Sequence, residues 1–286
     1  MVRLIFGCGY LGHRVASRWL ADGGDVVAVT RSARRAAEFQ SEGLRPVLAD
    51  VTRPDSLAGL PAADTVLYAI GYDRQSEASR HEVYADGLRA ALRALPPETG
   101  RIIYVSSTGV YGDSEGRLVD EDSPCRPARQ SGRAILAAEG ILRSHAMGSR
   151  AVVLRLAGIY GPGRIPRLAD LRSGWPLPIS ERAHLNLVHV DDAVAAVLAA
   201  ESRGDLPALY NISDGHPCGR RDFYRRLAEL LGLGEPQFVE PLAEEAVSER
   251  AGDKRVSNAR MLSELHFALR YPSYREGLAA IVAAMG

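Results

Sequence analysis

Lysine is nearly absent from this chain. Lys254 is the only lysine among 35 basic residues, and all the others are arginines. A glycine-rich phosphate loop that ends in Gly-Lys therefore cannot occur in the first two-thirds of the sequence. Lysine-dependent mechanisms are excluded from the same region.

Cysteine is also scarce, with Cys8, Cys125 and Cys218 as the three examples. They are widely spaced and odd in number, which fits neither a disulfide framework nor a zinc pattern. The seven histidines are scattered and show no His-Glu-x-x-His spacing. We therefore expect no metal site. A Gly-x-Ser-x-Gly nucleophile turn is missing too.

Net charge and long apolar runs are likewise absent. The formal net charge is zero, so the sequence gives no general electrostatic reason to bind nucleic acid or an anionic membrane. No apolar run approaches the roughly 18 residues of a membrane span. Because the chain starts directly with a strand pattern, we expect no signal peptide and a cytoplasmic location.

What the sequence does contain is a glycine motif at its start. The apolar run 2–6 leads into Gly7-Cys8-Gly9-Tyr10-Leu11-Gly12, and a helical pattern follows. In this Gly-x-Gly-x-x-Gly context, the first glycine permits the turn, the second lets a pyrophosphate approach, and the third lets helix pack on strand. The N-terminus of the following helix then offers free N–H groups and a partial positive charge to the phosphates. A strand–helix turn without a ligand is the alternative.

Alternating patterns predict a Rossmann-type α/β fold with a doubly wound parallel sheet and a small C-terminal α/β lobe. The expected strands cover residues 2–6, 25–30, 45–49, 64–70, 101–106, 151–156, 186–190 and 208–212. The expected helices cover residues 11–20, 32–40, 77–95, 131–145, 193–201, 222–231, 261–265 and 274–284. We predict a dinucleotide-binding domain at 1–156 and a smaller substrate-side lobe at 157–286, with part of 157–212 returning to the sheet.

The tip of the second strand bears on the choice of cofactor. An NAD-binding fold usually has an acidic residue there for the ribose 2′-hydroxyl. Here Arg31 and Ser32 follow the strand, with Arg34 and Arg35 behind them. A guanidinium suits a 2′-phosphate, which favours NADP over NAD. The alternative is that these arginines belong to a solvated helix start and bind no phosphate. Asp50, beside Val51, could accept from the adenine amino group or could be a turn residue.

Several later segments carry a family resemblance. They are Leu48–Thr52, Tyr104–Gly112 (Tyr-Val-Ser-Ser-Thr-Gly-Val-Tyr-Gly), Leu154–Gly163, Val188–Ala193 and Tyr210–Gly215. In this order and spacing they resemble the extended short-chain dehydrogenase/reductase family, also called the NAD-dependent epimerase/dehydratase family. The resemblance runs from residue 2 to about residue 225.

The resemblance implies roles for individual residues. Ser107 would orient a substrate carbonyl or hydroxyl, although a strand-end hydroxyl bonded to backbone is the alternative. The implied cofactor residues add Ser106 and the strand tip Ala69, Ile70 and Gly71 to those of the glycine motif and the second strand. The implied substrate residues are Thr108, Tyr111, Gly158, Tyr160 and Asn186, and packing is the alternative for Tyr111.

One departure from the family concerns its Tyr-x-x-x-Lys pair. That pair lies one helical turn apart, and the lysine lowers the tyrosine pKa for proton transfer. In the corresponding helix Ser131 occupies the tyrosine position and Ile135 the lysine position. This pattern resembles the atypical branch of the family. Ser131 is a candidate that relays or donates a proton, while Lys254 is expected outside the nucleotide fold.

The combined prediction is an NAD(P)-binding protein of the epimerase/dehydratase type. We expect an oxidoreductase or epimerase acting on a small polar substrate, with a homodimer as a possible assembly. The alternative is a non-catalytic dinucleotide sensor or regulator that has lost the catalytic pair.

Overall fold

The computed structural model describes residues 1–179, 184–242 and 253–285 of the chain. The chain divides into two compact units. Unit 1 contains Met1–Ser107, Arg133–Arg155 and Val197–Tyr210, and unit 2 contains Thr108–Gly132, Leu156–Ala196 and Asn211–Gly286. The domain boundary predicted after residue 156 stays a prediction.

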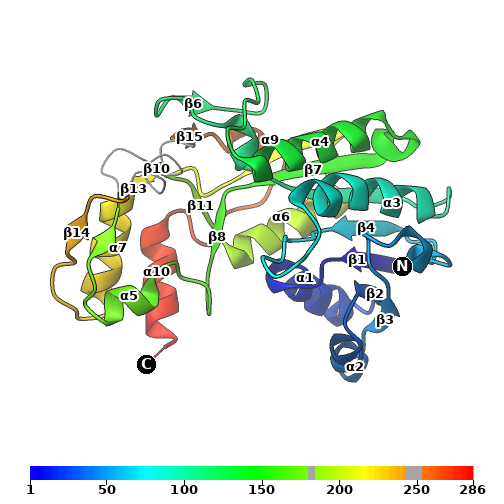
Figure 1. The fold of residues 1–286 in the computed structure, drawn as a ribbon, viewed down its shortest axis with the longest axis horizontal. Coiled ribbons are helices and arrows are strands. Elements are labelled where there is room, and N and C mark those ends of the chain that lie inside the picture. Colours follow the sequence, from blue (N-terminus) through cyan, green and yellow to red (C-terminus); the bar gives the residue numbers. More distant parts are fainter. Residues whose placement is uncertain (180–183, 243–252, 286) are drawn as a thin grey trace. The chain divides into compact units, whose positions relative to one another are not determined.

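Unit 1 is built around a seven-stranded sheet with the strand order β12-β7-β5-β4-β1-β2-β3 (Figure 1). The strands are β1 (Val2–Phe6), β2 (Asp25–Thr30), β3 (Arg45–Leu48), β4 (Thr65–Tyr68), β5 (Arg101–Ser107), β7 (Ala151–Leu156) and β12 (Ala208–Ile212). The pairings from β3 through β5 are all parallel. The doubly wound sheet predicted from the sequence is confirmed.

Apolar side chains on both faces explain why these strands form the centre. Leu4 and Phe6 lie in a core with residues of α3 (Gly87–Ala94) and α4 (Gln130–Ser144), such as Leu92 and Leu142. A strand buried on both faces reads as a continuous apolar run, which is why β2, β7 and β12 have the predicted bounds. Figure 1 shows α1 (Tyr10–Ala21) and α2 (Ala33–Ser41) on the side of the sheet opposite α3.

The helix predicted at 77–95 begins later than expected. Ser79 and Glu82 form a capping box, in which Glu82 N donates to Ser79 Oγ at 3.2 Å and Ser79 N donates to Glu82 Oε2 at 2.8 Å. The π-helical turn η2 (Glu82–Asp86) then leads into α3. The predicted start at about residue 77 is too early, because residues 77–82 (Glu-Ala-Ser-Arg-His-Glu) are almost all polar and carry no apolar period.

The strands within unit 2 are short. Its strand pairs are β6 (Leu118–Val119) with β15 (Arg255–Val256), β8 (Gly158–Tyr160) with β11 (Leu187–His189), β9 (Leu177–Pro178) with β14 (Phe238–Val239), and β10 (His184–Leu185) with β13 (Cys218–Gly219). Its helices include α5 (Leu168–Arg172), α7 (Arg220–Leu230), α9 (Ala259–Leu265) and α10 (Tyr274–Ala283). Tyr160, Phe223, Tyr274 and Leu278 belong to its own apolar core.

The helix α6 (Val190–Ser202) begins three residues before the predicted start at residue 193. The sequence predicts Asp191 and Asp192 as its cap, but both lie within its first turn. The carboxylate of Asp192 instead accepts hydrogen bonds from the backbone N–H groups of Arg270 and Tyr271 at 2.7 and 3.0 Å. Asp192 therefore binds the backbone at 270–271 to the start of α6. In the described part of the chain, no helix is long and apolar enough to cross a membrane.

Candidate functional site

The glycine turn between β1 and α1 is shaped by two close approaches. Gly7 has φ of +86°, and a Cβ there would overlap the backbone of Ala69. A Cβ at Gly12 would overlap the carbonyl of Gly7. At both positions a side chain would require the backbone to move, so only glycine fits.

Gly9 differs from the other two glycines of the motif, because a Cβ there would meet no atom of the described residues within 4 Å. Protein atoms therefore pack against the turn at Gly7 and Gly12, which we call closed, and leave space beside Gly9, which we call open. Gly9 is also the N-cap of the 12-residue helix α1 and makes no side-chain capping bond. Backbone N–H groups at such a helix start attract anions, so this turn fits a dinucleotide pyrophosphate.

The thiol of Cys8 lies inside this turn and is 7% exposed. Burial raises its pKa to about 12, against a smaller opposing effect of the Arg35 charge. A thiol in this state stays protonated, so Cys8 behaves as a packing residue of the turn. The guanidinium of Arg35 donates to the Cys8 carbonyl at 3.3 Å, which places a cation directly beside the glycine turn.

The three arginines after β2 have carboxylate neighbours. Arg31 pairs with Asp73 at 2.5 Å, and Glu38 accepts from Arg34 and Arg35 at 2.8 Å each. These pairs are half-exposed, and such pairs contribute only about 0–1 kcal/mol each. A phosphate could replace the carboxylates at little cost. Ser32 caps α2 by accepting from Arg35 N at 3.3 Å.

The predicted adenine-side residues adopt a turn geometry. Asp50 Oδ1 accepts from the backbone N–H of Thr52 at 2.9 Å and from its hydroxyl at 2.7 Å. One carboxylate oxygen of Asp50 therefore stabilises the turn that follows β3. Val51 is buried, and its side chain lies where a Cβ on Gly87 would come within 2.8 Å.

The backbone after β4 forms the other side of the glycine turn. Ala69 N donates to the carbonyl of Phe6 at 2.8 Å, so the end of β4 stays paired with the end of β1. Ile70 packs against the core of unit 1, while nothing lies within 4 Å of a Cβ on Gly71. These positions agree with a backbone that runs along a bound cofactor.

A buried ion pair beneath the end of β5 was not predicted from the sequence. Arg155 makes two hydrogen bonds to Glu139, at 3.0 Å from Nε and 2.7 Å from Nη2, and both side chains are nearly inaccessible. Ser106 donates to the same carboxylate at 2.5 Å. Ser106 is therefore held by unit 1 itself. Its hydroxyl is 33 residues from Glu139 in sequence, so only the fold could show the contact.

The residues after Ser107 form the turn η3 (Thr108–Tyr111) of unit 2. Ser107 is half-buried, whereas Thr108 and Tyr111 are buried. The Tyr111 hydroxyl donates to Asn211 Oδ1 at 2.7 Å, and Asn211 N donates to Glu121 at 2.7 Å. This network buries Tyr111 and binds its hydroxyl, while the substrate role of Tyr111 stays a prediction.

The start of α4 packs on the same turn. A Cβ at Gly132 would come within 2.8 Å of the Gly109 carbonyl, so a glycine is needed at this approach. Ser131, the residue before it, is half-buried. The segment that carries Ser131 is therefore brought against the turn that follows Ser107.

The other predicted substrate residues lie in β8 and beside β11. Tyr160 is fully buried, and its hydroxyl donates to the Ser273 carbonyl at 3.4 Å. Gly158 N donates to the Asn186 carbonyl at 2.9 Å. The Asn186 amide binds the backbone on both sides of Arg255, at Lys254 O (2.9 Å) and Val256 N (2.7 Å). Substrate contact stays a prediction for these three residues.

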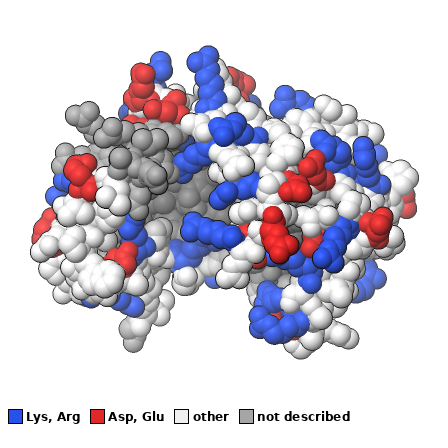
Figure 2. Space-filling model, viewed as in Figure 1, with Lys and Arg blue, Asp and Glu red and all other residues white. Residues whose placement is uncertain are grey.

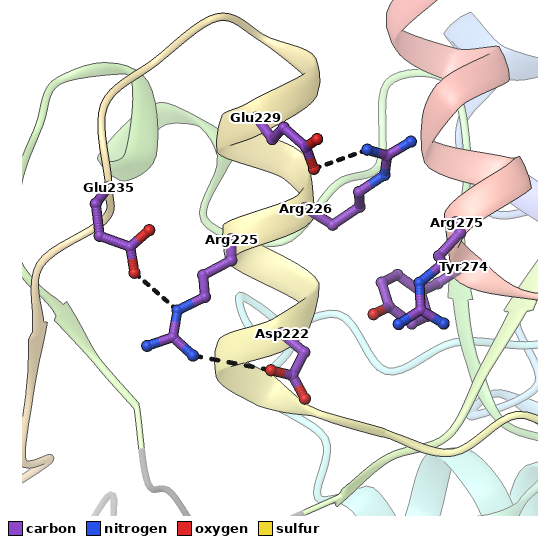
Figure 3. Close-up of a pocket in the computed structure, with 7 residues that line it drawn as sticks. All are labelled: Asp222, Arg225, Arg226, Glu229, Glu235, Tyr274 and Arg275. Atoms are coloured by element: carbon purple, nitrogen blue, oxygen red, sulfur yellow. Dashed lines mark hydrogen bonds and ion pairs between the residues drawn. The ribbon is translucent and has the colours of Figure 1, made fainter.

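A separate charged hollow of about 550 Å³ lies between α7 and α10 of unit 2 (Figure 3). Its arginines pair with its acids: Arg225 with Glu235 at 2.7 Å and Asp222 at 3.8 Å, and Arg226 with Glu229 at 2.7 Å. Arg275 lies against Tyr274. This hollow has equal numbers of arginines and carboxylates and none of the predicted residues.

Across the face that Figure 2 displays, acidic and basic side chains are interspersed. This agrees with the zero net charge of the sequence. Among the residues that the structure describes, no group of three or more His, Cys, Asp and Glu side chains could hold a metal ion.

Comparisons with known proteins bear on the glycine turn and the motifs after it. The model of the NAD dependent epimerase/dehydratase family matches residues 4–213. This chain belongs to that family. The resemblance to extended short-chain dehydrogenases/reductases is thereby confirmed, and the chain is an NAD(P)-binding protein of the epimerase/dehydratase type.

Among individual relatives, Protein YeeZ of Escherichia coli K12 is 32% identical over 275 residues, covering 94% of this chain and 95% of YeeZ. A structure from Methylobacillus flagellatus, provisionally described as an NAD-dependent epimerase/dehydratase, is 33% identical with a TM-score of 0.78, covering 99% and 98%. MoeE5, solved with UDP-glucuronic acid and NAD, is 25% identical with a TM-score of 0.77, again covering 99% and 98%.

Proposed function

We propose that this chain is an NADP(H)-dependent oxidoreductase or epimerase that acts on a small polar substrate. The observation that carries the proposal is the glycine turn, which is closed at Gly7 and Gly12 and open at Gly9. Family membership supports a nicotinamide dinucleotide as the ligand of this turn. When bound, that cofactor would supply or accept a hydride.

The preference for NADP rests on the tip of β2. Arg31 is 51% exposed, and its partner Asp73 can be displaced because exposed ion pairs are weak. Arg35 reaches the carbonyl of Cys8 and so connects this tip to the glycine turn. The two guanidiniums would hold a ribose 2′-phosphate by charge-assisted hydrogen bonds.

The substrate role is assigned to Ser107. Its position at the end of β5, directly before the turn η3, agrees with a hydroxyl that donates to a substrate carbonyl or accepts from a substrate hydroxyl. A non-catalytic sensor is the second candidate, and the residues Ser131 and Ile135 favour it. A lone serine is a weaker proton donor than a tyrosine activated by lysine.

The deciding experiment uses two readouts on the whole chain: consumption of NADPH with ketones, and formation of the epimer from sugar nucleotides in the presence of NADP+, because an epimerase returns the hydride to its substrate and consumes no cofactor. It compares the parent with Ser107→Ala and with the double variant Ser131→Tyr, Ile135→Lys. The enzyme proposal expects turnover in the parent and at least about a tenfold loss in Ser107→Ala. Turnover that survives Ser107→Ala removes the role of Ser107. No turnover in the parent or in the double variant favours the sensor.

A further inference from the structure

One ion pair of unit 1 joins the ends of two strands that are not neighbours in the sheet. Arg31 directly follows β2, and its Nη2 atom lies 2.5 Å from Oδ2 of Asp73, in the segment after β4. In the sheet order, β1 lies between β4 and β2. Because the three strands are parallel, their carboxyl ends lie at one edge of the sheet. The ion pair therefore crosses the end of β1, where the glycine turn begins.

Both sides of this ion pair are connected to the glycine turn. At the end of β4, the backbone of Ala69 lies where a Cβ on Gly7 would overlap it. After β2, the guanidinium of Arg35 donates to the carbonyl of Cys8 at 3.3 Å. Open α/β sheets bind their ligands at the carboxyl ends of such strands. The ion pair thus lies at the edge of unit 1 that fits the dinucleotide.

The segment that carries Asp73 has hydrogen bonds of its own. Asp73 Oδ1 accepts from Gln75 N at 3.0 Å, and Tyr72 N donates to the hydroxyl of Tyr84 at 3.1 Å. One oxygen of the Asp73 carboxylate therefore stabilises its own turn, while the other binds Arg31. The guanidinium of Arg31 can leave the carboxylate without breaking that turn.

Both side chains of the pair are about half exposed, 51% for Arg31 and 46% for Asp73. At this exposure the paired arginine is favoured over the free one by at most about fivefold, because water and salt screen both charges. A ligand that needs Arg31 then binds with its affinity reduced to the fraction of molecules in which Arg31 is free. A phosphate monoester carries more negative charge than a carboxylate and offers three acceptor oxygens, so it can displace Asp73.

We propose that Asp73 adjusts the cofactor preference of this chain by competing with the ribose 2′-phosphate of NADP(H) for Arg31. This inference rests on the proposed function. NADP(H) displaces the carboxylate from the guanidinium, whereas the 2′-hydroxyl of NAD(H) leaves the ion pair intact. Asp73 therefore lowers the affinity for NADPH but not the affinity for NADH, and it narrows the difference between the two cofactors.

Removing the charge of Asp73 while keeping its shape tests this competition. Asp73→Asn retains an oxygen for Gln75 N and loses the charge that holds Arg31. NADPH and NADH are titrated separately into the full chain, and binding is followed by the fluorescence of the nucleotide. Asp73→Asn should tighten NADPH binding by about two- to sixfold and leave NADH binding unchanged. Unchanged or weaker NADPH binding in this variant would overturn the proposal.

A second ion pair on the same strand provides a matched control. Asp25, at the start of β2, pairs with Arg45 at 3.2 Å, and these side chains are 48% and 55% exposed. The start of β2 lies at the opposite edge of the sheet from Arg31. Asp25→Asn removes one negative charge from the same unit and should change the affinity for neither dinucleotide. An equal gain of NADPH affinity in Asp25→Asn and Asp73→Asn would reveal a general effect of net charge, which contradicts a specific role of Asp73.

The double variant Arg31→Ala, Asp73→Asn distinguishes competition from direct repulsion between the carboxylate and the phosphate. Competition requires the guanidinium, so the gain of NADPH affinity from Asp73→Asn should disappear in the Arg31→Ala background. A gain of the same size in both backgrounds would overturn the proposal, because the carboxylate would then act on the phosphate without Arg31.

The failure of this proposal differs from the failure of the proposed function. If neither dinucleotide binds to the parent, the proposed function fails, and the role of Asp73 with it. If NADPH binds to the parent and Arg31→Ala weakens that binding, but Asp73→Asn gives no gain, the role of Asp73 fails and the NADP preference stands. Thermal unfolding of every variant should match that of the parent, because both ion pairs are exposed.

Discussion

Each of the two units is stabilised internally in a different way. Unit 1 is built on a sheet of strands four to seven residues long, in which the central strands β1 and β4 are largely buried and pair in parallel register. Unit 2 uses strand pairs of two or three residues, supplemented by side chains that bind distant backbone. Asn186, Glu121 and Asp192 each make such bonds over 68 to 90 residues of sequence. The local sequence pattern determines the fold of unit 1, whereas side-chain contacts over long stretches of sequence determine the fold of unit 2.

Unit 1 should depend most on its one buried ion pair. Glu139→Gln leaves the Arg155 guanidinium buried without its counter-charge, which should lower the free energy of unfolding by about 3–5 kcal/mol. Urea unfolding measures this change. Glu38→Gln, in an exposed pair, is the control and should cost less than about 1 kcal/mol. Equal losses of unfolding free energy in the two variants would contradict the distinction between the buried and the exposed ion pair.

Unit 2 should be sensitive to pH through Asp214. Burial raises the pKa of Asp214 to about 7, and its Oδ2 has no hydrogen-bond partner among the residues that the structure describes. The folded state then keeps a proton that the unfolded state has lost, so stability decreases as the pH rises from about 4 to 7, by at most about 4 kcal/mol.

Asp214→Asn should remove this part of the decrease, because the amide keeps an acceptor for His216 N and carries no charge. Unfolding curves at about pH 4, 5.5 and 7 would measure it. The parent and Asp214→Asn share every other titratable group, so the difference between their pH slopes reports the loss of the Asp214 carboxyl. Identical pH slopes would be the contrary result.

The glycine turn of unit 1 allows fold and binding to be separated. Gly7→Ala adds a Cβ at positive φ against Ala69, and should destabilise by about 2–4 kcal/mol. Gly9→Ala meets open space, so it should leave stability unchanged and weaken dinucleotide binding by at least about tenfold, or about 1.4 kcal/mol.

Thermal unfolding and NADPH fluorescence titration give the two readouts. Gly140, which also has open space around it but lies in α4, provides the control Gly140→Ala with unchanged binding. Should Gly9→Ala bind NADPH as the parent does, the open side of the turn would not be the pyrophosphate site.

The smallest effect is expected at the tip of β2. Arg31→Ala removes an exposed ion pair with little effect on stability, and should weaken NADPH binding by about tenfold without changing NADH binding. Arg34→Ala, at the 81% exposed neighbour, is the matched control. Equal effects of Arg31→Ala on the two dinucleotides would refute a 2′-phosphate contact.

The fold of unit 1 was predictable because most residues of its strands are apolar and because glycine or capping residues lie between its elements. The bounds of β2, β7 and β12 agree with the prediction to the residue. The motif from Gly7 to Gly12, together with the strand pattern before it and the helical pattern after it, indicates a dinucleotide fold. The predicted start of the helix at about residue 77 was too early, since the capping box of Ser79 and Glu82 marks the helix start.

Contacts made by single side chains across long stretches of sequence could not be predicted. The pairing of Glu139 with Arg155 and the hydrogen bond from Lys254 Nζ to the Gly112 carbonyl have no local signal. The absence of lysine from the first two-thirds of the chain is plain in the sequence, but it does not show where the fold carries the one lysine present. Such contacts depend on the tertiary path of the chain and not on spacing.

The most direct test of the central claim is calorimetric titration of the full chain with NADPH and, separately, with NADH. The account predicts one molecule of NADPH bound per chain, more tightly than NADH, with affinity lost when Gly9 carries a side chain. No heat of binding from either dinucleotide at millimolar concentration would contradict it.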